Sequence, residues 1–137
     1  MANKVVAATI LALMKADYDL DLVDLRFIGM SSTYTWNVAH DFLDDVTNII
    51  TDAVAATGEA VASITGGGNL DCADLTLTTV NGAVASVYAY DHTGGANSAR
   101  RLVSFYDTGT GLPTGTLSNG SVPLTIHSSG VLTIASA

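Results

Sequence analysis

The sequence contains few charged side chains and a single cysteine. Charged residues make up 13% of the 137 residues, which is about half the share in an average globular domain. Because Cys72 is alone, the chain cannot form an internal disulfide or a cluster of thiolate metal ligands. Asp71 and Asp74 flank Cys72 and disfavour its thiolate form. We therefore interpret Cys72 as a buried, unreactive thiol.

Basic residues are especially scarce, with five Lys and Arg against 13 Asp and Glu and a net charge of −8. Binding to a nucleic-acid backbone requires a basic patch, so we exclude nucleic acid as a direct partner. No run approaches the roughly 18 apolar residues that a membrane-spanning helix needs, and we expect no membrane partner. The acidity favours a partner with a basic surface.

Thr, Ser, Ala and Gly stand where charged residues are usually found, and 48% of the residues are hydrophobic. A neutral, mildly apolar exterior is more easily covered by partner subunits than kept solvated. The composition therefore favours an assembled protein over a monomer with a neutral surface. The length suits one domain with a core of its own.

The most regular strand pattern lies between Val84 and Pro113, where two alternating stretches flank a loop of small residues. In the first stretch one face carries Val84, Ser86, Tyr88 and Tyr90, and the other carries Ala85, Val87 and Ala89. Both faces include apolar side chains, so we expect this strand to pack on both sides. A second strand is expected from Arg101 to Tyr106.

The rest of the chain shows short strand patterns separated by turn residues. We expect an extended stretch from Asp17 to Met30 with a bend near Leu22, two strands around a Thr57-Gly58 turn between Ile49 and Ile64 (with a helix as the alternative), and a loop at Gly66–Gly68. We further expect a strand from Leu75 to Val80 with a type I′ hairpin turn at Asn81-Gly82, and a loop from Thr114 to Ser121. Pro123 is expected in an edge strand or at the start of a strand, and a last strand is expected from Val131 to Ala135.

These patterns predict a mainly β fold: a small antiparallel β-sandwich or barrel-like domain with an N-terminal helix and one short helix near residues 37–45. The first helix is expected from Asn3, as its N-cap, to Lys15, with Val6, Ile10, Leu13 and Met14 on its apolar stripe. Residues 1–16 are thus a helix or arm, and residues 17–137 a single β-rich domain. The alternative for the N-terminal stretch is a secretory signal, with a mature chain beginning near Ala16 or Asp17.

The densest group of titratable residues is His40, Asp41, Asp44 and Asp45. A carboxylate pair could perform acid–base chemistry, and His40 with Asp44 has the spacing of two metal ligands on a helix. The segment offers no second His and no nucleophile nearby, and carboxylates at a helix end are usually solvated. We therefore predict no catalytic, cofactor-binding or metal-binding residue; Asn37 is expected to cap the short helix.

The residues with the strongest claim to bind a partner are Val6, Ile10, Tyr34, Trp36 and Arg100. The first two lie on the N-terminal helix, and Arg100 can pair with a partner carboxylate. Arg100 and Arg101 are neighbours in an extended segment and so point to opposite faces. Two alternative functions use the same regions: a glycan-binding module that stacks sugars on Tyr34, Trp36, Tyr88 or Tyr90, and a hydrolase built on His40 with Asp41, Asp44 or Asp45.

Several stretches, in their order along the chain, resemble a family of small virion structural proteins of tailed bacteriophages. The stretches that carry the resemblance are Thr33-Tyr34-Thr35-Trp36, Ala39-His40-Asp41-Phe42, Asp71-Cys72-Ala73-Asp74-Leu75-Thr76, Tyr90-Asp91-His92-Thr93-Gly94, Leu102-Val103, and Asp107 to Pro113. The ordering spans nearly the whole chain and is more specific than any single motif.

The resemblance implies a non-enzymatic structural role in the phage head, where the protein decorates or cements the lattice of the major capsid protein on the capsid exterior. A place in the head–tail connector or the tail is the alternative. The protein is then made in the cytoplasm of the bacterial host and assembled into the virion. We expect a symmetric homo-oligomer, with a trimer at a local threefold position as one arrangement.

Overall fold

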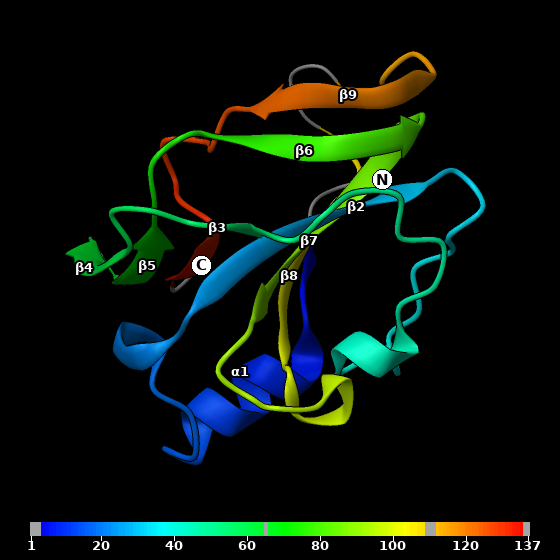
Figure 1. Ribbon diagram of the computed structural model, residues 1–137. Helices are drawn as coiled ribbons and strands as arrows, with labels where there is room; N and C mark the ends of the chain where they lie inside the picture. Colours follow the sequence, from blue (N-terminus) through cyan, green and yellow to red (C-terminus); the bar gives the residue numbers. More distant parts are fainter. Residues whose placement is uncertain (1–3, 65, 109–111, 136–137) are drawn as a thin grey trace.

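The computed structural model describes residues 4–64, 66–108 and 112–135 and is mainly β (Figure 1). Its strands are β1 (Lys4–Val5), β2 (Leu25–Ser31), β3 (Val54–Ala55), β4 (Ala60–Ile64), β5 (Gly67–Asp71), β6 (Leu75–Gly82), β7 (Val84–Asp91), β8 (Leu102–Tyr106), β9 (Leu117–Leu124) and β10 (Leu132–Ala135). Its helical segments are the α-helix α1 (Ala7–Met14) and the 3₁₀ turns η1 (Leu20–Leu22), η2 (Leu43–Asp45) and η3 (Asn97–Ala99).

The centre of the molecule is a five-stranded antiparallel sheet in the order β1-β8-β7-β2-β3. β7 lies in the middle and pairs with both β2 and β8. The two strands predicted between Val84 and Pro113 are therefore confirmed as the β7–β8 pair, although β8 begins at Leu102 rather than Arg101. Two smaller antiparallel sheets accompany it, β10-β5-β4 and β6-β9.

Both faces of the central sheet are buried, as the alternation in β7 predicts. Leu25, Phe27 and Val87 belong to one core cluster, whereas Tyr88 and Phe105 belong to a second. The antiparallel partners of β7 bury their alternate side chains in the same two clusters. The central sheet is thus a layer with a hydrophobic core on each side.

One predicted facing in β7 is wrong. Met30 pairs with Ser86 and Ser31 pairs with Val84, so Ala85 is an extra residue that reverses the alternation. Val84 consequently joins the core cluster of Val87 instead of sharing a face with Tyr88.

Two different layers cover the central sheet (Figure 1). The two smaller sheets cover one face and contribute the buried side chains of Leu70, Leu77, Val122 and Leu132. α1 and the segment from residue 31 to 46 cover the other face and contribute Val6, Tyr34, Leu43 and Val46. Antiparallel sheets that pack together in this way confirm the predicted small β-rich fold.

The N-terminal helix is shorter than predicted, because Lys4 and Val5 form β1. Lys4 pairs with Phe105 and Val5 with Ser104 at the edge of the central sheet, so strand pairing replaces the first helical turn. Val6 occupies the N-cap position, while Asn3, the predicted cap, lies outside the described residues. The threonine of the helix, Thr9, is buried and its hydroxyl donates to the Leu102 carbonyl.

The predicted hairpin turn at Asn81-Gly82 is wrong, because both residues lie within β6, which pairs with β9 and not with β7. Asn81 accepts a hydrogen bond from the Asn119 backbone N–H across this pair, at 2.9 Å. The loops predicted at Gly66–Gly68 and at Thr114–Ser121 are too long, because β5 begins at Gly67 and β9 at Leu117. β6 and β9 are extended by pairing with each other, and β5 by pairing with its neighbour β4 and with the distant β10.

The short helix predicted near residues 37–45 is the 3₁₀ turn η2, and it begins at Leu43. Asn37 does not cap it; its Oδ1 accepts from the Ala39 N–H in a local turn. The bend predicted near Leu22 is confirmed as η1, and β2 follows from Leu25.

The two strands predicted around Thr57-Gly58 are confirmed as β3 and β4, and Gly58 has the positive φ, 67°, that the turn requires. They do not pair with each other, since β3 pairs with β2 and β4 with β5. The last strand is confirmed as β10. Pro123 lies in β9, whose partner in the described part of the chain is β6, so the prediction of an edge strand is also confirmed.

Candidate partner-binding surface

The five residues predicted to bind a partner do not lie on one surface. Val6 and Tyr34 are buried in the core between the central sheet and α1. Ile10, Trp36 and Arg100 are half-buried, on three separate segments. In this structure the side chains of Val6 and Tyr34 face the core and are not accessible to a partner.

Tyr34 is the centre of a hydrogen-bond chain that runs from the core to the surface. Its hydroxyl lies 3.0 Å from the Tyr88 hydroxyl and 2.7 Å from His40 Nδ1. Burial raises the pKa of both Tyr34 and Tyr88, so both phenols keep their protons at neutral pH. The Tyr34 hydroxyl thereby connects His40 to Tyr88 and attaches the segment of residues 33–42 to the central sheet.

Trp36 extends this attachment to the N-terminal strand. The Lys4 ammonium lies 3.7 Å from the centre of the Trp36 ring, a cation–π contact, and the ring also lies 6.5 Å from that of Phe105. Tyr88 and Tyr90 are buried. The aromatic residues considered for sugar stacking are thus packed in the core or covered on one face by a lysine.

In the acidic group around His40, Asp45 forms hydrogen bonds with the local backbone. Asp45 Oδ2 accepts from the Asp41 and Phe42 N–H groups at 3.0 and 3.2 Å, and these bonds lower the pKa of Asp45. Burial and then the neighbouring Asp45 raise the pKa of Asp41. Among the described residues, no three His, Cys, Asp or Glu side chains lie close enough together to hold a metal ion.

Arg100 is committed to its own loop. Its guanidinium donates to the Gly94 carbonyl at 3.0 Å and to Asn97 Oδ1 at 2.9 Å, and lies 3.2 Å from His92 Nε2. Desolvation, with Arg26 and Arg100 nearby, lowers the pKa of His92. The neutral imidazole therefore accepts from Arg100 at Nε2 and donates from Nδ1 to the Tyr90 hydroxyl, 3.1 Å away. A partner carboxylate would have to compete with these bonds.

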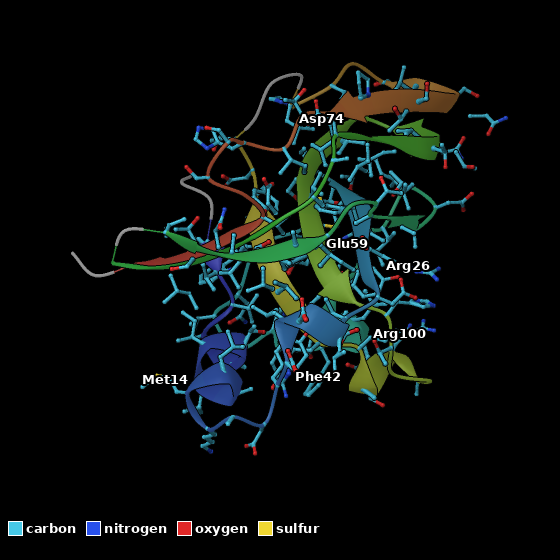
Figure 2. The ribbon with its side chains drawn as sticks, turned by 90° about the vertical axis from the view of Figure 1, so that its left-hand side faces the viewer. Met14, Arg26, Phe42, Glu59, Asp74 and Arg100 are labelled. Carbon is cyan, nitrogen blue, oxygen red and sulfur yellow. The ribbon has the colours of Figure 1, made fainter. Side chains whose placement is uncertain are left out.

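Arg101 points away from Arg100, as predicted, and contacts three other segments. Its guanidinium lies over the rings of Tyr18 and Phe42, at 5.5 and 5.1 Å, and Nη1 donates to the Ala8 carbonyl. Figure 2 shows Phe42 beside α1 and below Arg100. Arg101 therefore links α1 to the segments before β2 and before η2.

Cys72 matches its prediction. It is buried, and desolvation, followed by the charges of Asp71, Glu59 and Asp74, raises the pKa of its thiol to about 11. The thiolate is therefore a minor species at neutral pH.

The surface that the sequence analysis missed is the outer face of α1, formed by Ala7, Leu11 and Met14, which we call the helix face. Leu11 is 53% exposed and Met14 is 81% exposed, and Figure 2 places Met14 at the periphery of the molecule. A helix that is apolar on all sides is normally buried on all sides. The signal in the sequence is that AATILALM contains no charged residue.

The helix face adjoins an acidic segment. Asp17, Asp19 and Asp21 follow α1 directly, and all three are exposed. Asp19 caps η1 by accepting from the Asp21 N–H, and Leu22 in η1 is a further exposed apolar side chain. An apolar area next to charged residues has the composition of a protein-binding surface, with an apolar centre and a polar rim.

In the described ranges no helix is long and apolar enough to cross a membrane. Comparison of the chain with family models, with curated proteins and with solved structures found no match.

Proposed function

We propose that this chain is a non-enzymatic structural protein of a tailed-phage virion that decorates the capsid by binding the lattice of the major capsid protein. The observation that carries the proposal is the helix face, where the apolar side chains of Leu11 and Met14 are exposed to water on a helix that contains no charged residue. The ordered phage-like motifs supply the kind of partner. A surface of this kind is stabilised when another subunit covers it.

Covering the helix face contributes favourable apolar burial to binding. Complete burial of one Leu or Met side chain contributes about 1.5 to 3 kcal/mol. Met is also enriched at protein interfaces, because its flexible side chain adapts to an irregular partner surface. Two such residues on a helix docked against the sheet form an apolar centre that pays little conformational entropy on binding.

Charge defines the complementary surface. With 13 acidic and five basic residues, and with Asp17, Asp19 and Asp21 exposed next to α1, the expected partner has an apolar depression bordered by Lys or Arg. Such a pair associates faster at low salt, because opposite charges steer the encounter.

The other candidate functions have less support. Glycan binding requires accessible aromatic faces, but Tyr34, Tyr88 and Tyr90 are buried. For a hydrolase built on His40, the hydroxyl within hydrogen-bond distance of the imidazole belongs to Tyr34, and burial raises the pKa of that phenol, which makes it a poor nucleophile. The remaining alternative, a position in the head–tail connector or the tail, uses the same helix face and differs in location.

The test uses particles from the phage whose genome carries this chain, with the gene deleted, and purified protein added back. We expect the protein to sediment with the heads and to raise the temperature at which they release DNA. The variant Met14→Glu should bind the heads with at least about tenfold lower affinity, because covering the helix face would then remove water from an unpaired carboxylate. The matched control is Val38→Glu, another exposed apolar residue, which should bind normally.

Three outcomes would contradict the proposal: absence of the chain from wild-type particles, no binding to heads, or normal binding of Met14→Glu. Binding to tails or connectors but not to heads would replace decoration by the alternative location.

A further inference from the structure

The strand β4 is an exposed edge. It pairs with β5 on one side, and in the described part of the chain no strand pairs with its other side. Ala60, Val61, Ala62 and Ser63 are all exposed, whereas most strands of the molecule bury one face or both. Figure 1 places β4 at the periphery, on the far side of β5 from the central sheet.

This edge lacks the features that usually prevent an edge strand from pairing with another chain. Natural edges are protected by charged side chains, prolines, bulges or a covering segment. Ala60–Ile64 contains no charged residue and no proline, and its pairing with β5 runs through five consecutive residues without a register shift. Its backbone groups are therefore presented in a regular row.

The side chains of the sheet β10-β5-β4 also end abruptly at this edge. Val61 pairs with Leu70 and Leu70 with Leu132, so the three side chains form one row on the same face. Leu70 and Leu132 are buried, but Val61 is 48% exposed. In the next row Ile134 is 42% exposed, opposite Gly68. The row that ends at Val61 is therefore incomplete where β4 ends the sheet, whereas Ile134 lies on β10 at the opposite edge.

We propose that β4 pairs antiparallel with β4 of a second copy of this chain, around a twofold axis at Ala62, and that the two three-stranded sheets become one continuous sheet. Pairing the whole strand with itself places Ala62 opposite Ala62, Val61 opposite Ser63, and Ala60 opposite Ile64. Each pair is uncharged, and each includes at least one small side chain. A twofold contact is self-complementary by construction.

The absence of charge within β4 lets two copies of this acidic chain meet at this edge. Each copy carries a net charge of −8, so two copies repel unless they meet where charge is absent, and Ala60–Ile64 is such a stretch. A basic partner, which the acidity of the chain attracts, would find no carboxylate on this strand. We assign the helix face to a foreign partner and the β4 edge to a second copy.

A contact of five residues per strand is small compared with a standard protein interface. We therefore expect a weak, concentration-dependent dimer in solution that becomes populated where many copies are held close together. The proposal does not depend on the capsid role, because it concerns purified protein alone.

The first experiment is disulfide trapping of Ala62→Cys in a Cys72→Ala background. Residues directly opposite in an antiparallel pair have Cα atoms about 4.5 to 5.5 Å apart, within the range that a disulfide spans. Mild oxidation should produce a covalent dimer. Ala96→Cys, at an exposed position between β7 and β8, is the control and should cross-link at least about tenfold more slowly.

The second experiment is sedimentation velocity over a concentration series. The parent protein should show dimer at high concentration, and Ala62→Lys should be monomeric because it places two ammonium groups opposite each other. Ala96→Lys, with the same charge change, should dimerise like the parent. A parent that is monomeric at all concentrations, a trimer, or a dimer that Ala62→Lys leaves intact would overturn the proposal. None of these outcomes depends on whether the protein binds phage heads.

Discussion

The central sheet and the sheet β10-β5-β4 use the same antiparallel pairing but bury it differently. In the central sheet, β7 has six of eight residues buried, because a core lies on each face. In β4 no residue is buried, although its pairing with β5 is more regular than that of β7, which contains shifts on both sides. The hydrogen-bond ladder alone therefore does not distinguish the two regions; the covering layers do.

This difference predicts where the molecule opens. Regions with few buried apolar contacts and exposed backbone hydrogen bonds open at a lower free energy than the core. β4 belongs to the first kind and β7 to the second. The predictions below compare the two regions, beginning with the largest effect.

Replacement of Phe105 by Ala should have the largest effect on stability. Phe105 is 2% exposed, and its ring lies 5.0 Å from that of Tyr88 and 6.1 Å from that of Tyr34. The cavity should lower the free energy of unfolding by about 3 to 5 kcal/mol. Urea denaturation measures the loss, and a loss under about 1 kcal/mol would show that this face is not a packed core.

Removal of the Tyr34 hydroxyl should have the next largest effect. Tyr34→Phe leaves the Tyr88 hydroxyl and His40 Nδ1 without their shared partner, and an unsatisfied buried polar group costs about 1 to 3 kcal/mol. Tyr88→Phe, the matched control, keeps the bond between Tyr34 and His40 and should cost less. Equal losses for the two variants in urea denaturation would mean that the bond to His40 contributes nothing.

Asp45 should contribute a pH-dependent part of the stability. The pKa of Asp45 is lowered by the N–H groups of Asp41 and Phe42, so its contribution is present above the unfolded-state pKa and is lost as the pH falls through the folded-state value. Asp45→Asn should cost about 1 kcal/mol at pH 7, and the difference from the parent should vanish in acid.

The measurement for Asp45 is thermal or urea unfolding between pH 7 and pH 2. Asp44→Asn, at the exposed neighbouring position, serves as the control and should follow the parent curve. A deficit in Asp45→Asn that persists unchanged in acid would assign the effect to packing and not to the carboxylate.

Val61→Ala should have the smallest effect. It should lower the free energy of unfolding by less than about 0.5 kcal/mol, as is usual for an exposed position. The comparison with Phe105→Ala should be made with dilute protein, in which the copies are separate. A cost above about 2 kcal/mol would show that β4 is held as firmly as a core strand.

The sequence predicted those parts of the fold that are determined by local alternation. The β7–β8 pair, the two-sided packing of β7, the bend at Leu22 and the buried Cys72 were all visible in the order of residues. The predicted hairpin at Asn81-Gly82 is wrong, because β6 pairs with β9, about forty residues away, and not with β7. Turn propensity carries no information on such distant pairing. The strand at Gly67 starts early because Gly67 pairs on both sides, with Ile64 of the neighbouring β4 and with Ala135 of the distant β10.

The candidate surface was harder to predict than the fold. Val6 and Tyr34 were selected for their chemistry, but both are buried against the central sheet. The predicted stripe of the N-terminal helix is wrong at Met14, which faces solvent. Thr9 is buried because its hydroxyl reaches the Leu102 carbonyl, and this rotation turns Leu11 and Met14 toward solvent. The phase of a short apolar helix cannot be read from its sequence when no charged residue marks the outer side.

Side-chain oxidation of Met14 and Met30, the two methionines among the described residues, tests the central claim most directly. Met14 is exposed and Met30 is fully buried, so in free protein a brief oxidant pulse should convert Met14 to its sulfoxide and spare Met30. In intact virions we predict that Met14 becomes as protected as Met30, because the capsid lattice covers the helix face. Oxidation of Met14 in virions at the rate of the free protein, or absence of the chain from virions, would contradict the account.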